Sequence, residues 1–500
     1  MSKLNLDRRN FLRGMGYVAA GTALGLPGRA GAQARPEDAR FLVVLTASGG
    51  ASLIDSFLSI RASESANAST INTYEDNRVQ SIADSPFRAI DSQGSDLGAL
   101  PAPYTANQSN FVRKHKDDMM VVTCTGTSVN HAVAQKRAIT GNEAWAGRTL
   151  QEVNAMQYGE SFLLPNVVMA TGTAYIDPGT DGSLPSYCSG EPVAQPALWP
   201  LSLHGTRGVK GPNADFVKMA RRVRDEQLDP RSKFARVFDK SPALSRWRQQ
   251  RLATQGLETS DLITKLMLFE DSERYPLSAH GLTESSSGRL VRERFPNFDQ
   301  DPLEAQAALA FLLLKNRVSV SVTLGTSFNA VLADGASLGG GGLQEGDLIN
   351  PPIGFDFSHQ AHRATQAMMW SRVLAAADGL IELLKAEEFA DGQSFWDRTL
   401  LYVATDFGRD KVRPSGSEDF GTSHHLNNGF LLVSPLVNGN TVLGGVDPDT
   451  GLTYGFDPVT GAPAPGTEMA EAQIYAGIAG ALGVDTTGSG LPNVPAMSRS

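Results

Sequence analysis

Residues 399–428, TLLYVATDFGRDKVRPSGSEDFGTSHHLNN, decide how the rest of the chain is interpreted. The stretch begins with an apolar run, residues 400–404, whose length and composition are typical of a buried strand. Asp406 follows this run, and a Gly- and Ser-rich loop then carries His424 and His425. Ligands of open α/β sheets bind at the carboxyl ends of the strands, and carboxylates and imidazoles are metal ligands. We therefore expect Asp406 and His424 in a metal site; the alternative is that Asp406 caps a turn and both histidines face solvent.

Two apolar runs nearer the N-terminus have the same form. Residues 41–45, FLVVL, are a predicted strand that leads through Gly49 and Gly50 to Asp55. Residues 119–124, MMVVTC, are a second predicted strand, and a small polar turn follows it. Two glycines after a strand allow a tight turn and a close approach of the backbone. We expect Asp55 near the tip of the sheet, as a further metal ligand.

The turn after residues 119–124 contains candidate catalytic side chains. A strand, a polar turn and a helix together present a nucleophile or an anion site at the first amides of the helix. We expect Ser128 as the nucleophile and His131 as a general base or a ligand. The alternative is that Ser128 or Asn130 is the N-cap of a helix over residues 132–139 and that His131 is an ordinary first-turn residue.

The densest group of potential ligands is GFDFSHQAH, residues 354–362. It holds Asp356, His359 and His362 at a junction between a loop and a helix predicted over residues 366–387. His359 and His362 have the spacing of neighbours on one face of a helix. We expect all three as metal ligands; the alternative is a polar helix start whose histidines have ordinary hydrogen bonds.

Potential ligands follow the predicted strands at one end of the sheet. They include five of the eight histidines and three aspartates: His131, His359, His362, His424, His425, Asp55, Asp356 and Asp406. We therefore expect one shared site that holds a divalent ion, and zinc, calcium and manganese all accept ligand sets of this kind.

Composition favours a large globular α/β protein. The 500 residues include 44 basic and 53 acidic side chains, a formal charge of −9 without long blocks of one sign, which argues against a nucleic-acid-binding surface. Apolar positions at helical spacing from 215 to 269 predict a helical insertion or lid at about residues 211–300. Its cluster of Arg221, Arg222 and Arg224 is interpreted as a solvated helix face, with contact to an acidic substrate as the alternative.

The first 32 residues are predicted to be an export signal. DRRNFLR at residues 7–13 precedes a weakly apolar stretch, residues 15–26, and a small-residue pattern, AGA, at residues 30–32. This order resembles the twin-arginine signal, which implies the twin-arginine export machinery as a partner and a periplasmic or secreted location. No later stretch approaches the ~20 apolar residues of a membrane span, so we expect no transmembrane segment.

Three further patterns have simple interpretations. Cys124 and Cys188 form one disulfide or remain two separate thiols. The near-repeats DPDTG at 447–451 and DPVTG at 457–461 are interpreted as hairpin turns in preference to calcium loops. The Gly-rich residues 336–346 are expected to form a loop without a phosphate-binding role.

Several motifs together resemble one protein family. The Arg-Arg signal, GGASLIDSF, SVNHAVAQKRAITG, GFDFSHQAH, ATDFGR and GTSHH occur in this order over nearly the whole chain. In series they resemble the exported bacterial family called domain of unknown function 1501, which is related to the alkaline phosphatase and sulfatase superfamily. The resemblance implies an α/β fold over residues 33–500, an alkaline phosphatase-like three-layer α/β/α sandwich with a mixed, mostly parallel sheet.

The same resemblance implies two metal ions at the tip of the sheet. The positions that match the superfamily's ligands are Asp55, Asp356 with His359 or His362, Asp406, and His424. Its nucleophile lies at the start of the helix that ends in Thr-Gly. The chain departs from the pattern at Phe407, where the superfamily has a ligand histidine, and at His131, where the nucleophile would fall, leaving Ser128 or Thr127 as displaced candidates.

Two functions follow as hypotheses. The first is an exported metal-dependent hydrolase of the alkaline phosphatase or sulfatase type that acts on a phosphate or sulfate ester of a small molecule or polymer. The second is a non-catalytic periplasmic binding or assembly protein that retains the fold. The Asp and His cluster favours the first, and the altered nucleophile and ligand positions favour the second.

Overall fold

The structure is a computed structural model. It describes residues 36–91, 108–170, 172–204, 214–238, 240–241, 261–326, 331–332, 348–350, 354–414, 417 and 420–499. The predicted signal at 1–32 and the Gly-rich stretch 336–346 lie outside these residues.

A mixed, mostly parallel sheet forms the centre of the protein. Its eight strands have the order β16-β4-β15-β12-β1-β7-β5-β6. They are β1 (Phe41–Ala47), β4 (Met119–Thr125), β5 (Asn166–Val168), β6 (Glu191–Pro192), β7 (Ser321–Gly325), β12 (Thr399–Thr405), β15 (Asn427–Val433) and β16 (Thr441–Leu443). Only β15 runs antiparallel to its neighbours, β4 and β12, while all other pairs in this sheet are parallel. The predicted α/β class is confirmed.

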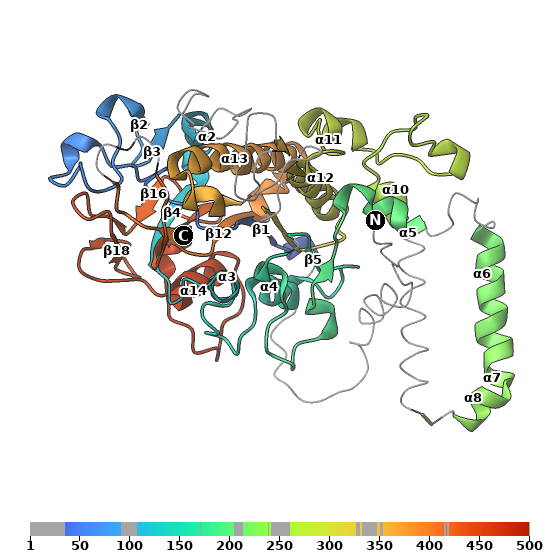
Figure 1. Cartoon of the computed structure of the whole chain (residues 1–500). Coiled ribbons are helices and arrows are strands. Elements are labelled where there is room, and N and C mark those ends of the chain that lie inside the picture. The colour runs from blue at the N-terminus through green and yellow to red at the C-terminus, as the bar shows by residue number, and fades with distance from the viewer. Residues whose placement is uncertain are drawn as a thin grey trace.

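Helices cover both faces of the sheet (Figure 1). On one face lie α12 (Pro302–Lys315) and α13 (His362–Ala386), and on the other α3 (His131–Thr140), α4 (Leu150–Tyr158) and α14 (Glu471–Ala481). Successive side chains of a strand point to opposite faces. Accordingly, Val43 of β1 is in the same apolar core as Leu309 and Leu380, whereas Val44 is in the core with Ile478. A strand buried on both faces has a continuous apolar sequence, which is why β1, β4 and β12 were predictable.

Smaller elements surround these layers. The short strands are β2 (Val79–Ser81), β3 (Arg88–Ile90), β8 (Val331–Leu332), β9 (Leu348–Asn350), β10 (Glu388–Ala390), β11 (Gln393–Ser394), β13 (Gly408–Arg409), β14 (His424–His425), β17 (Gly445–Val446), β18 (Thr453–Phe456) and β19 (Pro463–Ala464). The other α-helices are α2 (Gln108–His115), α5 (Trp199–His204), α6 (Ala214–Arg222), α7 (Asp229–Arg231), α8 (Lys233–Val237), α10 (Leu262–Leu266) and α11 (Gly288–Arg294). A π-helix, η9 (Val223–Leu228), joins α6 to α7. The 3-10 turns are η1 (Pro36–Asp38), η2 (Ala62–Glu64), η3 (Asp76–Arg78), η5 (Lys116–Asp118), η6 (Ala174–Ile176), η7 (Ser186–Cys188), η8 (Pro196–Leu198), η10 (Ser278–His280), η11 (Phe355–His359), η12 (Trp396–Arg398) and η13 (Pro495–Met497).

The described part of the predicted insertion, 211–300, contains helices separated by non-helical segments such as residues 267–277. It holds α6 to α8, α10 and α11, and α6 to α8 lie at one end of the molecule (Figure 1). Among the described residues, no helix is both long and apolar enough to cross a membrane.

The remaining sequence patterns have simple outcomes. Cys124 and Cys188 are both free and buried, so they are two separate thiols. Asp447 accepts hydrogen bonds from the backbone and hydroxyl of Thr450, and Asp457 does the same with Thr460. These bonds within each turn are those of the predicted hairpin turns.

Candidate metal centre

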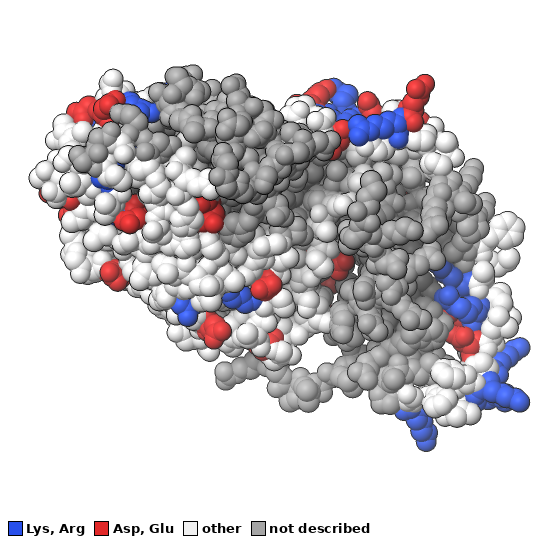
Figure 2. All heavy atoms as spheres, viewed as in Figure 1, with Lys and Arg blue, Asp and Glu red and all other residues white. Residues whose placement is uncertain are grey.

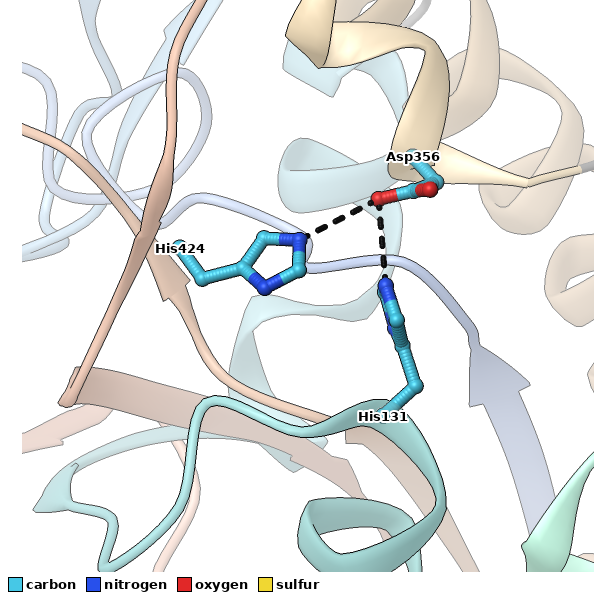
Figure 3. A group of neighbouring side chains, drawn as sticks. All are labelled: His131, Asp356 and His424. Carbon is cyan, nitrogen blue, oxygen red and sulfur yellow. Dashed lines mark ion pairs between the residues drawn. The ribbon is translucent and has the colours of Figure 1, made fainter.

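Three side chains from separate segments converge at the carboxyl end of the sheet (Figure 3). His131 is the first residue of α3, directly after β4 and its polar turn; Asp356 lies in η11, before α13; His424 lies in β14, in the loop after β12. Asn130 is the N-cap of α3 and accepts a hydrogen bond from Val133 N, so the helix start fixes the position of His131.

The distances from Asp356 to three histidines suit a small divalent ion. Asp356 Oδ1 lies 3.3 Å from His131 Nε2 and 3.4 Å from His424 Nε2. His359, at the end of η11, places its Nε2 3.3 Å from the same oxygen. With bonds of ~2.0–2.1 Å, ligand atoms around a tetrahedral ion are about 3.3–3.4 Å apart. The separations from Asp356 therefore match those of ligands that share one ion. We call His131, Asp356, His359 and His424 the metal cluster.

Hydrogen bonds at the far side of two rings prepare them to bind a cation. His424 Nδ1 lies 2.8 Å from the carbonyl oxygen of Val129, and a carbonyl only accepts, so Nδ1 carries the proton. His131 Nδ1 lies 2.8 Å from Asp406 Oδ2, which likewise accepts. In the neutral rings the lone pair is therefore on Nε2, the atom that faces Asp356. This is the arrangement found around metal-ligating histidines, where an outer acceptor fixes the tautomer.

Asp406 positions His131 and is itself surrounded by donors. Its side chain is buried and accepts hydrogen bonds from Gly49 N at 3.0 Å, Gln135 Nε2 at 3.0 Å and Tyr175 Oη at 3.2 Å, in addition to His131. Both carboxylate oxygens are thus occupied by protein groups. The structure places this predicted ligand behind His131, in a supporting position.

Arg409 joins the loops that carry the cluster. Its buried guanidinium donates to Asp356 Oδ1 at 2.8 Å and to four backbone carbonyls, those of Gly49, Gly50, Phe355 and Thr422. Burial alone would raise the pKa of Asp356, but hydrogen bonds from His131 and Arg409 hold that pKa below its usual range. Asp356 is therefore a carboxylate at neutral pH.

The histidines of the cluster have different proton affinities. Burial lowers the pKa of His359, and the charge of Arg409 lowers it further. Burial also lowers the pKa of His424, against the hydrogen bond with Val129, so both rings are neutral and able to bind metal at pH 7. For His131, burial is outweighed by hydrogen bonds with Asp356 and Asp406, which raise its pKa to about 9. A metal ion would displace that proton.

Asp55 and His362 form a second cluster, which corrects the expectation of a single shared site. His362 is fully buried in α13, and its Nε2 lies 2.9 Å from Asp55 Oδ2. Asp55 also accepts hydrogen bonds from Asn72 and Tyr74. The two clusters meet at Thr422, whose hydroxyl lies 2.9 Å from His362 Nδ1 and whose carbonyl accepts from Arg409. With these partners, Asp55 and His362 form a buried polar network.

The hydroxyls of the two predicted nucleophiles have hydrogen-bond partners away from the metal cluster, for Ser128 within its own turn and for Thr127 in two helices. Ser128 Oγ accepts a hydrogen bond from Asn130 N at 3.1 Å. Thr127 Oγ1 lies 2.9 Å from Glu471 Oε2 and accepts from Arg137. Asn130, and not Ser128, is the N-cap. Among the described residues, these bonds direct both hydroxyls to groups other than the histidines of the metal cluster.

Phe407 is an apolar wall of the site. It is fully buried, and its ring stacks on His424 with centroids 3.9 Å apart and lies 4.8 Å from the ring centroid of His131. Phe407 thus fixes the two rings by packing at the place where the resembled superfamily has a further ligand. His425, the neighbour of His424, instead accepts a hydrogen bond from Asn427 N through Nδ1.

Comparison of the chain with models of known protein families and with curated proteins finds no match.

Proposed function

We propose that this chain is an exported metal-dependent hydrolase that acts on phosphate or sulfate esters, with an alkaline phosphatase-like three-layer fold. The observation that carries the proposal is the metal cluster: imidazole nitrogens and one carboxylate oxygen at ligand spacing, with Nδ1 of two rings already hydrogen-bonded to outer acceptors. The motif series that resembles the alkaline phosphatase and sulfatase superfamily supports the reaction class, and the twin-arginine pattern supports export.

Zinc fits this donor set best. Imidazoles together with one carboxylate are typical of zinc, with two rings when one position stays open and three rings when the site is closed, whereas calcium takes six to eight oxygen ligands. Manganese is the second choice, since it favours oxygen-rich sets. A bound zinc ion would supply a Lewis acid and lower the pKa of a bound water to about 7.

With a divalent ion bound, the charges around the cluster would favour an anionic substrate. Asp356 and Asp406 carry one negative charge each, and Arg409 carries one positive charge within 2.8 Å of Asp356. With a divalent ion and neutral histidines, the sum over these groups is positive. Opposite charges attract strongly in a partly buried site, so an ester that bears a phosphate or sulfate group is electrostatically matched to it.

His359 decides whether the site is open. A catalytic zinc keeps one position for water, and a structural zinc has four protein ligands. His359 is the most exposed member of the cluster, with 42% of its side chain accessible. Its Nε2 lies 2.8 Å from His424 Nε2, closer than the ~3.3 Å that separates two ligands of a tetrahedral zinc. We therefore assign His131, Asp356 and His424 as ligands, and His359 as the group that exchanges a proton with water or the leaving group at the open position.

The second candidate, a non-catalytic binding or assembly protein, is favoured by the hydrogen bonds of Ser128 with Asn130 and of Thr127 with Glu471. In that case His359 is the fourth ligand and the ion is structural.

Turnover assays separate the two candidates. The zinc-loaded mature protein is assayed with p-nitrophenyl phosphate, bis-p-nitrophenyl phosphate and p-nitrophenyl sulfate. We expect turnover of at least one ester, a loss of at least about 100-fold in kcat/KM for His424→Ala, and little change for the control His425→Ala. Ser128→Ala is expected to remain active, because in this proposal the nucleophile would be a water activated by the metal and not the hydroxyl of Ser128. A wild-type protein that binds zinc and turns over none of these esters supports the structural candidate.

A further inference from the structure

We propose that residues 214–238, the helical arm formed by α6, η9, α7 and α8, bind the surface of a membrane that contains anionic lipid. This inference concerns a surface away from the metal cluster and does not depend on the proposed reaction.

The arm carries an unusual concentration of exposed apolar side chains. Of the fifteen large apolar side chains that are exposed in the described part of the chain, seven lie within these 25 residues. They are Phe216, Met219, Val223, Leu228, Phe234, Val237 and Phe238, with exposed fractions from 36% to 74%. Isolated exposed apolar residues are normal, but a gathered set marks an interaction site.

The apolar residues of the first helix share one face. Phe216, Met219 and Val223 follow the i, i+3, i+7 spacing of an amphipathic helix. At the other end, Phe234 and Phe238 are four residues apart, and their ring centroids are 4.9 Å apart. An apolar helix face flanked by basic residues is the form of a helix that lies in the plane of a membrane interface.

The charge of the arm identifies the partner. Residues 214–238 include seven Lys or Arg and four Asp or Glu, a net charge of +3 in a chain whose formal charge is −9. Figure 2 shows basic side chains gathered over this end of the molecule, beside uncharged surface. A second copy of the chain would place one +3 arm against another in a two-fold contact, whereas anionic headgroups neutralise the charge and the acyl region accepts the phenylalanines.

Vesicle co-sedimentation of the protein without its predicted signal, residues 33–500, tests the proposal. We expect binding to vesicles of phosphatidylcholine with phosphatidylglycerol, weaker binding to phosphatidylcholine alone, and a decrease at high salt. Phe234→Ser/Val237→Ser is expected to weaken binding at least about tenfold. The matched control is Val412→Ser/Val459→Ser, whose native side chains are 60% and 64% exposed elsewhere, and it is expected to bind as the wild type does.

A charge variant and a mass measurement complete the test. Arg231→Glu/Arg236→Glu is expected to weaken binding by at least about 30-fold, because each surface basic residue contributes about fivefold. Circular dichroism of each variant is expected to match the wild type. The proposal is overturned if the protein does not bind the anionic vesicles, if the arm variants bind as the controls do, or if sedimentation shows a dimer that the arm variants abolish.

Discussion

Replacing Asp406 with asparagine tests whether the carboxylate of Asp406 orients the ring of His131. All four partners of Asp406 are donors: His131 Nδ1, Gln135 Nε2, Gly49 N and Tyr175 Oη. An asparagine has an NH₂ group in place of one carboxylate oxygen. In either orientation of the amide, this NH₂ group faces at least one N–H of the site, and two donors cannot form a hydrogen bond. If the NH₂ faces His131, that ring accepts at Nδ1 and carries its proton on Nε2, the atom that would bind the proposed metal ion.

The expected magnitudes follow from these contacts. Loss of one buried hydrogen bond to a charged acceptor lowers the free energy of unfolding of the metal-free protein by about 1.5–3 kcal/mol. Loss of an outer partner of a metal-ligating histidine lowers metal affinity by about 10–100-fold. Urea unfolding without metal measures the first quantity, and competition with a chromophoric chelator for zinc at pH 7 measures the second.

Asp301→Asn is the matched control. Asp301 is also a buried carboxylate with donors around it, Leu303 N and Arg372 Nη2, but it caps α12. We expect similar destabilisation and unchanged zinc affinity. If Asp406→Asn is destabilised like this control and still binds zinc as the wild type does, Asp406 has only a structural role and our interpretation of the His131 tautomer is refuted.

Three other substitutions have defined outcomes. Burial lowers the pKa of Lys411 from 10.5 to about 8, so the folded state binds this proton less tightly than the unfolded state does. The charged side chain therefore lowers the free energy of unfolding, fully below pH 8 and progressively less as the pH rises to 10.5. Lys411→Met is therefore expected to be more stable than the wild type at pH 7 by up to about 3 kcal/mol in urea unfolding, and a difference that persists unchanged at pH 10.5 would contradict this reasoning. Gly49 has φ +102, and a Cβ there would lie 2.3 Å from Asp356 N, whereas Gly466 has φ +85 and open space around its Cβ position. In thermal unfolding we expect Gly49→Ala to lose about 1–3 kcal/mol more than Gly466→Ala, and equal losses would show that the contact with Asp356 relaxes. Arg409→Lys is expected to lose about 2–4 kcal/mol in urea unfolding, because one ammonium cannot serve four carbonyls and Asp356; a loss below 1 kcal/mol would mean that the loops are held by other contacts.

The sequence predicts the strands of the sheet well, but it predicts poorly which candidate ligand side chains are buried. The strands β1, β4 and β12 follow from continuous apolar runs, and the end of the sheet that carries the polar residues follows from the α/β rule. What separates His359 from His362 is local: η11 ends at His359, and α13 begins at His362, before the predicted start at 366. The two rings therefore do not share a helical face, and His362 turns into the core.

The supporting residues were partly visible in the sequence. Gln135 lies four residues after His131 and thus on the same helical face, and Arg409 belongs to the ATDFGR motif. Their hydrogen bonds to Asp406 and Asp356 depend on tertiary packing, which periodicity does not encode. Asn72 and Tyr74, which are the hydrogen-bond partners of Asp55, lie in an aperiodic loop region. No sequence pattern therefore indicated that the side chain of Asp55 would be buried against them.

The most direct test of the central claim is elemental analysis of the protein without its predicted signal, residues 33–500, compared with the double variant Asp356→Ala/His424→Ala. We expect about one tightly held divalent ion per chain in the wild type, zinc first, and none in the variant, with both proteins folded. If the wild type carries no divalent ion after exposure to zinc, or if the double variant retains the ion, the metal cluster is a polar hydrogen-bond network and the hydrolase proposal is contradicted.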